Sequence, residues 1–105
     1  MNPNDFSKFL DEILSRIKFT LDSKSADYST TQDKLFNFKL QASIDGITPI
    51  EALRGNNLKH QASITQGLNE LQQGKIRPLG WWLEKGIDHI NYTILLLALI
   101  KEQQE

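Results

Sequence analysis

Apolar residues recur at three- and four-residue spacing along most of the chain, which is the period of an amphipathic α-helix. In the N-terminal segment this stripe consists of Phe6, Phe9, Leu10, Ile13, Leu14, Ile17 and Leu21. It predicts a helix from about Asn4 to about Ser23, with Asn4 as N-cap and Asp5 near the positive end of the helix. The polar stretch that follows, residues 23–32, predicts a loop.

A second helix is predicted to begin directly after this loop. Thr30 or Thr31 can cap it, and Asp33 lies three residues after Thr30, as in a partial capping box. The Asp-Gly pair that ends at Gly46 is typical of a helix C-terminus.

The clearest start signal in the chain precedes the third predicted helix. Thr48 is placed as N-cap, Pro49 occupies the first helical position, and Glu51 completes a capping box. We expect this helix to extend to Gly74, with a weak point at residues 55–57 (Gly-Asn-Asn) that kinks or splits it.

The last predicted helix, from about Trp81 to about Glu102, is apolar on most of its circumference. One stripe and the residues beside it comprise Leu83, Ile87, Ile90, Ile94, Leu95, Leu96, Leu97, Ala98, Leu99 and Ile100. A helix that is apolar all round is buried, and three other helices can cover only one or two of its sides. The remaining surface predicts a partner, most simply a second copy of the chain; the alternative is a central position in a four-helix fold.

These elements predict a single all-α domain over residues 1–105, a four-helix bundle that forms a homo-oligomer. The net charge of −1 provides no overall basic field, so we expect no long nucleic acid as partner. The absence of cysteine excludes disulfides and thiolate metal sites and fits a cytoplasmic location. The longest apolar run, Ile94 to Ile100, is too short to cross a bilayer, so no membrane partner is expected.

One polar constellation lies on the last predicted helix. Glu84, Asp88 and Asn91 are spaced i, i+4 and i+7, which places them on one helical face. Two aligned carboxylates repel each other unless a cation lies between them, and Mg²⁺ prefers such oxygen ligands. The alternative is that Glu84 faces solvent and pairs with Lys85 or Arg77.

Two further polar clusters carry groups that bind phosphates or the edge of a base. The first surrounds the predicted loop and comprises Lys24, Asp27, Tyr28, Asp33, Lys34 and Asn37. The second comprises Lys59, His60 and Ser63; the alternative for these is a solvated helix face and a packing role for His60. No nucleophile elbow, phosphate-binding loop, dinucleotide fingerprint or zinc-ligand spacing is present in the sequence.

Three segments taken in order resemble a known superfamily. They are KSADYSTTQDKLFNFKLQA, TPIEALRGNNLKHQASI and EKGIDHINYTILLLALIKE, which together lie between residues 20 and 102. They resemble small phage-encoded proteins of the MazG-like, all-α nucleotide pyrophosphohydrolase superfamily. The matching residues are Lys24, Asp27, Tyr28, Asp33, Lys34, Leu35, Asn37, Phe38, Lys59, His60, Ser63, Ile64, Glu84, Lys85, Asp88, Ile90, Asn91 and Tyr92.

The resemblance implies two functions that differ in their need for metal. Enzymes of the superfamily cleave nucleoside triphosphates to monophosphate and pyrophosphate, and they hold Mg²⁺ with two acidic residues on each of two helices. Glu84 and Asp88 correspond to the second pair, whereas Lys59 and His60 stand where the first pair is expected. Asp27 or Asp33 can replace that pair only if the first loop folds onto the last helix.

Basic groups in place of metal ligands suggest direct pairing with phosphate oxygens. The first hypothesis is therefore a nucleotide-binding protein that sequesters a nucleotide-derived immune signal in the cytoplasm of a phage-infected cell. The alternative is a Mg²⁺-dependent nucleoside triphosphate pyrophosphohydrolase, and a third is a helical interaction module without a ligand. The sequence leaves open whether Trp81 and Trp82 stack on a base or pack in a subunit contact.

Overall fold

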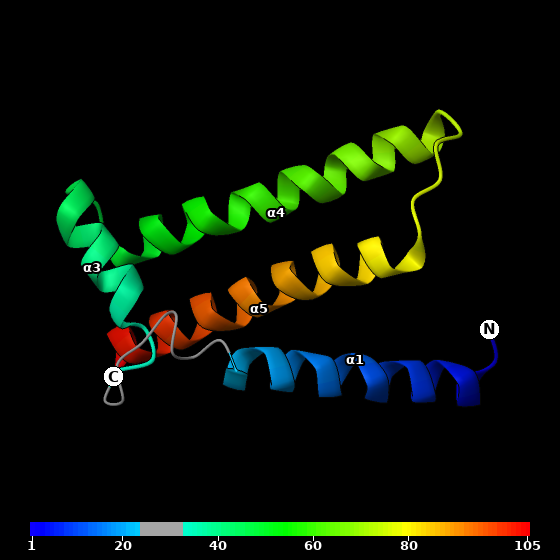
Figure 1. The fold of residues 1–105 in the computed structure, drawn as a ribbon. Helices are drawn as coiled ribbons and strands as arrows, with labels where there is room; N and C mark the ends of the chain where they lie inside the picture. Colours follow the sequence, from blue (N-terminus) through cyan, green and yellow to red (C-terminus); the bar gives the residue numbers. More distant parts are fainter. Residues whose placement is uncertain (24–32) are drawn as a thin grey trace.

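The computed structural model describes residues 1–23 and 33–105, and all regular structure within these two ranges is helical. The described helices are α1 (Pro3–Ser23), α3 (Phe36–Asp45), α4 (Pro49–Gln72) and α5 (Leu79–Gln104) (Figure 1). The predicted all-α fold is therefore confirmed for the described part of the chain. Over the same residues, no helix combines the length and the apolar character needed to cross a membrane.

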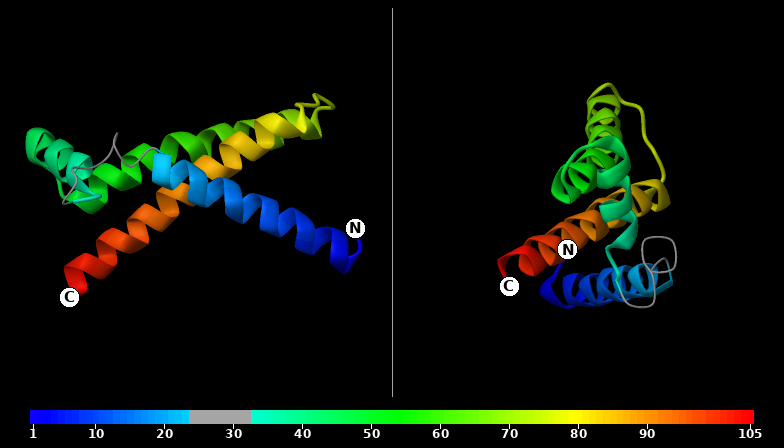
Figure 2. Two further views of the ribbon diagram at one scale, coloured as in Figure 1. Left: turned by 60° about the horizontal axis from the view of Figure 1, so that its bottom comes forward. Right: turned by 90° about the vertical axis from the view of Figure 1, so that its left-hand side faces the viewer.

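Helices α4 and α5 form an antiparallel hairpin around which the other two described helices are arranged (Figure 1). Helix α3 packs on α4 at the end of the hairpin that holds the C-terminus of α5. Helix α1 packs against α5 alone among the described helices, and it crosses α5 at a wide angle (Figure 2). Helix α5 is thus the element that α4 and α1 share.

The start of α1 differs from the sequence-based prediction by two residues. Asn2, rather than Asn4, is the N-cap, because its Oδ1 accepts a hydrogen bond of 2.8 Å from the backbone N–H of Asp5. Pro3 then occupies the first helical position, where its missing N–H costs no hydrogen bond. The predicted end at Ser23 is confirmed.

Helix α3 begins later than predicted, at Phe36. The turn before it is held by Asp33, whose Oδ1 accepts a hydrogen bond of 2.9 Å from the N–H of Leu35. The predicted caps Thr30 and Thr31 lie outside the described residues. The predicted stop is confirmed: Gly46 adopts φ 69°, a left-handed conformation that favours glycine, and its N–H bonds to Ala42.

Helix α4 has the predicted start but not the predicted break. The Thr48 hydroxyl accepts a hydrogen bond of 3.2 Å from the N–H of Glu51, and Pro49 is the first helical residue. The helix continues through Gly55 without interruption, so the predicted split was wrong. Asn56 explains part of this continuity, because its side-chain amide donates to the carbonyl of Ala52 one turn back and to Gln41 of α3.

The buried core lies at one end of the molecule, where α3, α4 and the C-terminal part of α5 meet. It consists of Leu35, Phe38, Leu53 and Leu99, of which Leu53 and Leu99 are almost completely buried. Ile50, Tyr92, Leu95 and Leu96 pack around this cluster. A smaller contact joins α1 to α5 and buries Ile17 and Ile87.

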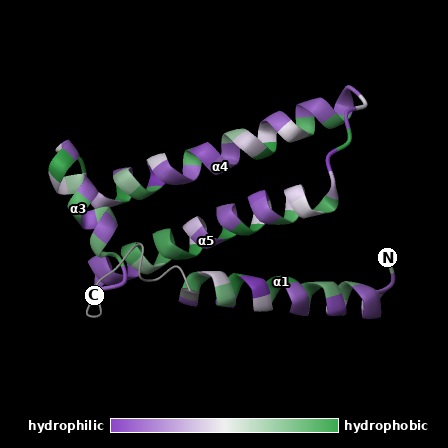
Figure 3. Cartoon of the chain, viewed as in Figure 1, coloured by the Kyte–Doolittle hydropathy of each residue, from purple (hydrophilic) through white to green (hydrophobic). Residues whose placement is uncertain are grey.

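Within the described part of the chain, α5 is only partly covered by other helices. Apolar and polar residues alternate along the described helices, α5 included (Figure 3). Ile90, Ile94 and Leu97 remain 39%, 38% and 60% exposed, and α4 and α1 are the described helices that pack against α5. This agrees with the prediction that the other helices cover only one or two sides of α5, and the partner expected on its remaining surface stays a prediction.

Candidate functional site

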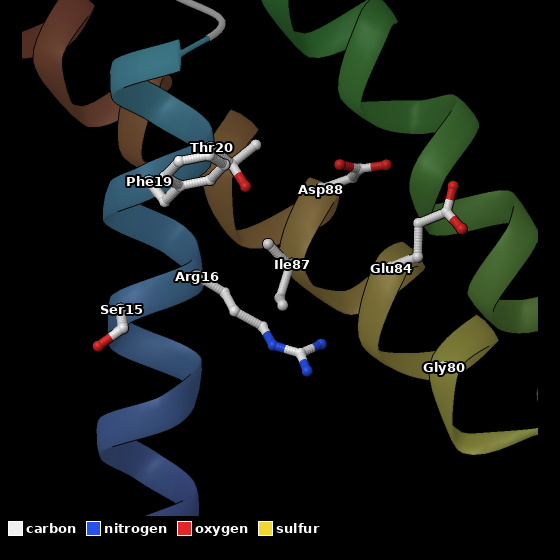
Figure 4. A pocket seen from close by; sticks show the side chains of 8 residues that line it. All are labelled: Ser15, Arg16, Phe19, Thr20, Gly80, Glu84, Ile87 and Asp88. Atoms are coloured by element: carbon white, nitrogen blue, oxygen red, sulfur yellow. The ribbon is translucent and has the colours of Figure 1, made fainter.

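The described residues contain a pocket between α1 and α5 with a volume of about 440 Å³. Its α1 wall is formed by Ser15, Arg16, Phe19 and Thr20, and its α5 wall by Gly80, Glu84, Ile87 and Asp88 (Figure 4). A volume of this size lies within the range of about 300–1,000 Å³ that is usual for small-molecule sites. Both metal ligands predicted from the sequence, Glu84 and Asp88, line it.

The geometry of α5 explains why these two carboxylates reach the pocket. Glu84 and Asp88 are four residues apart and therefore lie one turn apart on the same face. Asp88 also approaches His60 of α4, while Ile87 between them packs toward α1. The acidic face of α5, with Glu84 and Asp88, therefore lies between the side of α5 that packs on α4 and the side that packs on α1.

Arg16 provides a positive charge in the opposite wall of the pocket. Its side chain extends from α1 toward α5 beside Ile87, while the carboxylates of Glu84 and Asp88 lie on the α4 side of α5 (Figure 4). The guanidinium forms an ion pair of 2.9 Å with Glu12, one turn earlier in α1, and both side chains are about half exposed. An exposed pair of this kind contributes little to stability, so Arg16 can exchange Glu12 for an anionic ligand at low cost.

The structure brings together two of the predicted polar segments at Asp88. The Nδ1 of His60 lies 4.0 Å from Oδ2 of Asp88, and the imidazole packs on the ring of Tyr92 with centroids 4.9 Å apart. Burial, and secondarily the negative charge of Asp88, raises the pKa of the Tyr92 phenol above its usual value of 10.0. His60 therefore has a packing role against Tyr92 in addition to its contact with Asp88.

Asn91 is buried rather than presented to solvent. It is only 5% exposed, and its Oδ1 accepts no hydrogen bond from the described residues. Leaving a buried acceptor without a hydrogen bond costs about 1–3 kcal/mol. Because Asn91 follows Ile87 by four residues, it lies on the same face of α5, one turn beyond the pocket.

The other members of the second predicted cluster do not line the pocket. Lys59 is exposed on α4, and the hydroxyl of Ser63 donates a hydrogen bond of 3.1 Å to the Lys59 carbonyl within the same helix. The predicted contact of these two residues with phosphate therefore stays a prediction.

The first predicted cluster is only partly described, and its described members lie far from Glu84 and Asp88. Asp33 forms an ion pair of 2.7 Å with Lys39, which also binds Glu102 near the end of α5 at 2.5 Å. The hydrogen bond from Lys39 lowers the pKa of the Asp33 carboxyl. Lys34 and Asn37 are exposed beside this network. The remaining members, Lys24, Asp27 and Tyr28, lie outside the described residues.

This placement removes Asp33 as a partner for the carboxylates of the pocket. Glu102 follows Asp88 by fourteen positions along α5, which corresponds to about 20 Å of helix. Among residues 1–23 and 33–105, no group of three or more histidine or acidic side chains is arranged to hold a metal ion. Mg²⁺ is usually bound by one or two protein carboxylates, with substrate phosphates as further ligands. Two carboxylates, those of Glu84 and Asp88, line the pocket.

Trp81 and Trp82 have a packing role that the sequence did not reveal. Both indole rings lie against Gly67 of α4, and the two rings meet edge to face with centroids 5.0 Å apart. The guanidinium of Arg77 stacks over Trp81 at 4.4 Å and binds Glu70 at 2.7 Å. The tryptophans therefore join α4 to α5 within one chain, near the start of α5.

Sequence reasoning missed two residues, Arg16 and Gly67, because local sequence gives each an ordinary explanation. Arg16 follows Glu12 by four residues, which is typical of a surface ion pair on a helix. Gly67 has no neighbouring turn signal, although a glycine inside a strong helix pattern is a sign of close helix packing.

Comparison of the chain with protein-family models, with curated proteins and with solved structures finds no match. The similarity to MazG-like proteins therefore rests on the sequence motifs alone.

Proposed function

We propose that this chain is a nucleotide-binding protein and that the pocket between α1 and α5 is its site. The observation that carries the proposal is that one pocket is lined by Arg16 of α1 and by Glu84 and Asp88 of α5. A guanidinium binds phosphate oxygens, whereas carboxylates accept hydrogen bonds from ribose hydroxyls or from amino groups of a base. Nucleotides combine both kinds of group in one molecule.

The apolar part of the same pocket supports this choice. Phe19, which lines the pocket and is 73% exposed, provides apolar surface for a flat base. Small-molecule sites usually combine such apolar surface with a few polar groups that fix orientation. The pocket lining carries one positive and two negative side chains, so phosphates are best placed at Arg16 and away from the carboxylates.

Following the resemblance, the proposed role is that of a phage counter-defence protein which sequesters a nucleotide-derived immune signal in the cytoplasm of the infected cell. Binding without cleavage is supported by the lack of the first acidic pair of the related enzymes, at whose place this sequence has Lys59 and His60. The proposal includes a MazG-like arrangement of the helices and a homo-oligomeric form, since α5 keeps apolar side chains exposed in the single chain.

A Mg²⁺-dependent pyrophosphohydrolase is the second candidate, and one specific observation favours it. Glu84 and Asp88 line the same pocket one turn apart, so a single Mg²⁺ can contact both if a triphosphate supplies the other oxygens. The ion would neutralise charge on the phosphates. Loss of Mg²⁺ would then remove activity, whereas the binding function requires no metal.

Incubation of the protein with a panel of nucleotides, with and without Mg²⁺, separates the candidates. After denaturation and chromatography, recovery of intact nucleotide that had been retained by the protein supports binding. Release of monophosphate and pyrophosphate only in the presence of Mg²⁺ supports the enzyme. If no nucleotide is either retained or cleaved, both candidates are wrong and the helical interaction module takes their place.

A further inference from the structure

The single chain exposes more surface than a compact protein of its size. Its accessible surface is 7482 Å², whereas a folded monomer of 12.0 kDa is expected to expose about 6,000 Å². The radius of gyration is 16.1 Å, against about 13 Å for a compact domain of about 100 residues. The chain therefore exposes about 1,500 Å² more than a compact monomer of its mass.

Much of the exposed apolar area lies on α1 and α5. On α1, the stripe that buries Ile17 against α5 continues toward the N-terminus, where Phe6, Leu10 and Leu14 are 56%, 43% and 53% exposed. On α5, apart from Leu79 at its start, the exposed large apolar residues are Ile90, Ile94 and Leu97, which follow the contact at Ile87 toward the C-terminus. We call these six residues the α1–α5 apolar surface: Phe6, Leu10, Leu14, Ile90, Ile94 and Leu97.

The crossing of the two helices explains why this surface stays uncovered. Helix α1 meets α5 near Ile17 and Ile87, and from there the N-terminal half of α1 and the C-terminal half of α5 diverge (Figure 2). Among the described helices, each of the two therefore has one half in contact with the other helix and one half without that contact. The N-terminal half of α1 and the C-terminal half of α5 cannot contact each other unless the contact at Ile17 and Ile87 is broken.

We propose that a second copy of this chain covers the α1–α5 apolar surface. In a two-fold dimer, the free half of α1 from each copy packs against the free half of α5 from the other. A two-fold interface uses the same surface on both subunits, and this surface contains both halves of the required contact. The C-terminal half of α1 already packs on α5 within one chain, so the second copy extends a contact of the same chemistry.

The size of the uncovered area fits this partner. If a second copy covers this excess of about 1,500 Å² on each chain, the interface comprises about 3,000 Å², within the range of about 2,000–5,000 Å² that is usual for obligate homodimers. The net charge of −1 per chain adds little repulsion between copies. The dimer does not rest on the proposed nucleotide site, and the two can fail separately.

Sedimentation of matched leucine variants tests the dimer. Leu97 on the surface and Leu58 on α4 outside it are 60% and 61% exposed. The unaltered chain should sediment at twice the 12.0 kDa of one chain. Leu97→Glu should lose the dimer, whereas Leu58→Glu should keep it.

Because Leu97→Glu can also unfold the chain, cross-linking provides a second measurement on folded protein. The chain contains no cysteine, so single substitutions introduce a unique thiol. In an equimolar mixture, Leu10→Cys and Leu97→Cys should cross-link to each other with a short bismaleimide, because the dimer places α1 of one copy on α5 of the other. Leu58→Cys mixed with either variant should stay monomeric. A monomeric unaltered chain at high micromolar concentration, or cross-linking of Leu58→Cys to the same extent as the Leu10→Cys and Leu97→Cys pair, would overturn the proposal.

Discussion

Gly67→Ala is expected to destabilise the protein, although alanine normally favours a helix. A β-carbon at Gly67 would lie 2.6 Å from Cη2 and 2.7 Å from Cζ3 of Trp81, and 3.0 Å from Cη2 of Trp82. Real β-carbons do not approach other atoms to 2.6 Å, so an indole ring must move. The two rings contact each other, and Arg77 stacks on Trp81, so neither ring can move independently.

The magnitude follows from two opposing effects. Replacing glycine by alanine inside a helix stabilises it by about 0.5–1 kcal/mol. Forcing an extra carbon into a packed contact costs about 1–3 kcal/mol. Gly55 is the matched control in the same helix, because a β-carbon there meets no atom within 4 Å. Gly55→Ala should therefore stabilise the fold, and the two variants should differ by about 1–3 kcal/mol.

Thermal or urea unfolding followed by circular dichroism measures this difference directly. For a domain of this size, each 1 kcal/mol shifts the Tm by about 4–8 °C, so the two alanine variants should be separated by at least about 4 °C. Because both variants gain the same helix propensity, the separation reports the tryptophan contact alone. Equal stability of Gly67→Ala and Gly55→Ala would refute the close packing of the tryptophans on α4.

Arg16→Ala should weaken nucleotide binding roughly ten- to a hundredfold in calorimetric titration, because a charge-assisted hydrogen bond contributes about 1.5–3 kcal/mol. Arg54 is an exposed arginine of α4 outside the pocket, and Arg54→Ala should leave the affinity unchanged. If Glu84 and Asp88 bind Mg²⁺, the ion should raise the Tm by mass action and Asp88→Asn should abolish the rise; a Tm that neither Mg²⁺ nor EDTA changes would exclude the metal. The raised pKa of Tyr92 predicts that its stabilising effect is complete below about pH 10 and is lost as the pH rises through the folded-state pKa. When urea unfolding is followed from about pH 10 upward, Tyr92→Phe should lose less stability than the unaltered chain.

The sequence alone determined most of the helices, because helix signals are local. The Thr48-Pro49 start, the left-handed stop at Gly46 and the extent of α5 to within two residues at each end agree with the structure. The errors also have local causes. Asn2 and Asn4 are equally good caps in the sequence, and only the observed hydrogen bond selects Asn2. The weak point at Gly55 did not break α4, because Asn56 ties the helix to its own previous turn and to α3.

The composition of the pocket was decided only by the tertiary structure. Spacing alone predicted that Glu84 and Asp88 share a face, because positions four apart in a helix always do. That Arg16 lines the same pocket as these carboxylates depends on where α1 crosses α5, which no local pattern encodes. The same holds for Gly67 beneath Trp81, fourteen positions away in the chain, and for Asp33, which the fold places with Lys39 rather than with the pocket. Helix periodicity thus determined which side chains lie on one face, and packing between distant segments determined what that face meets.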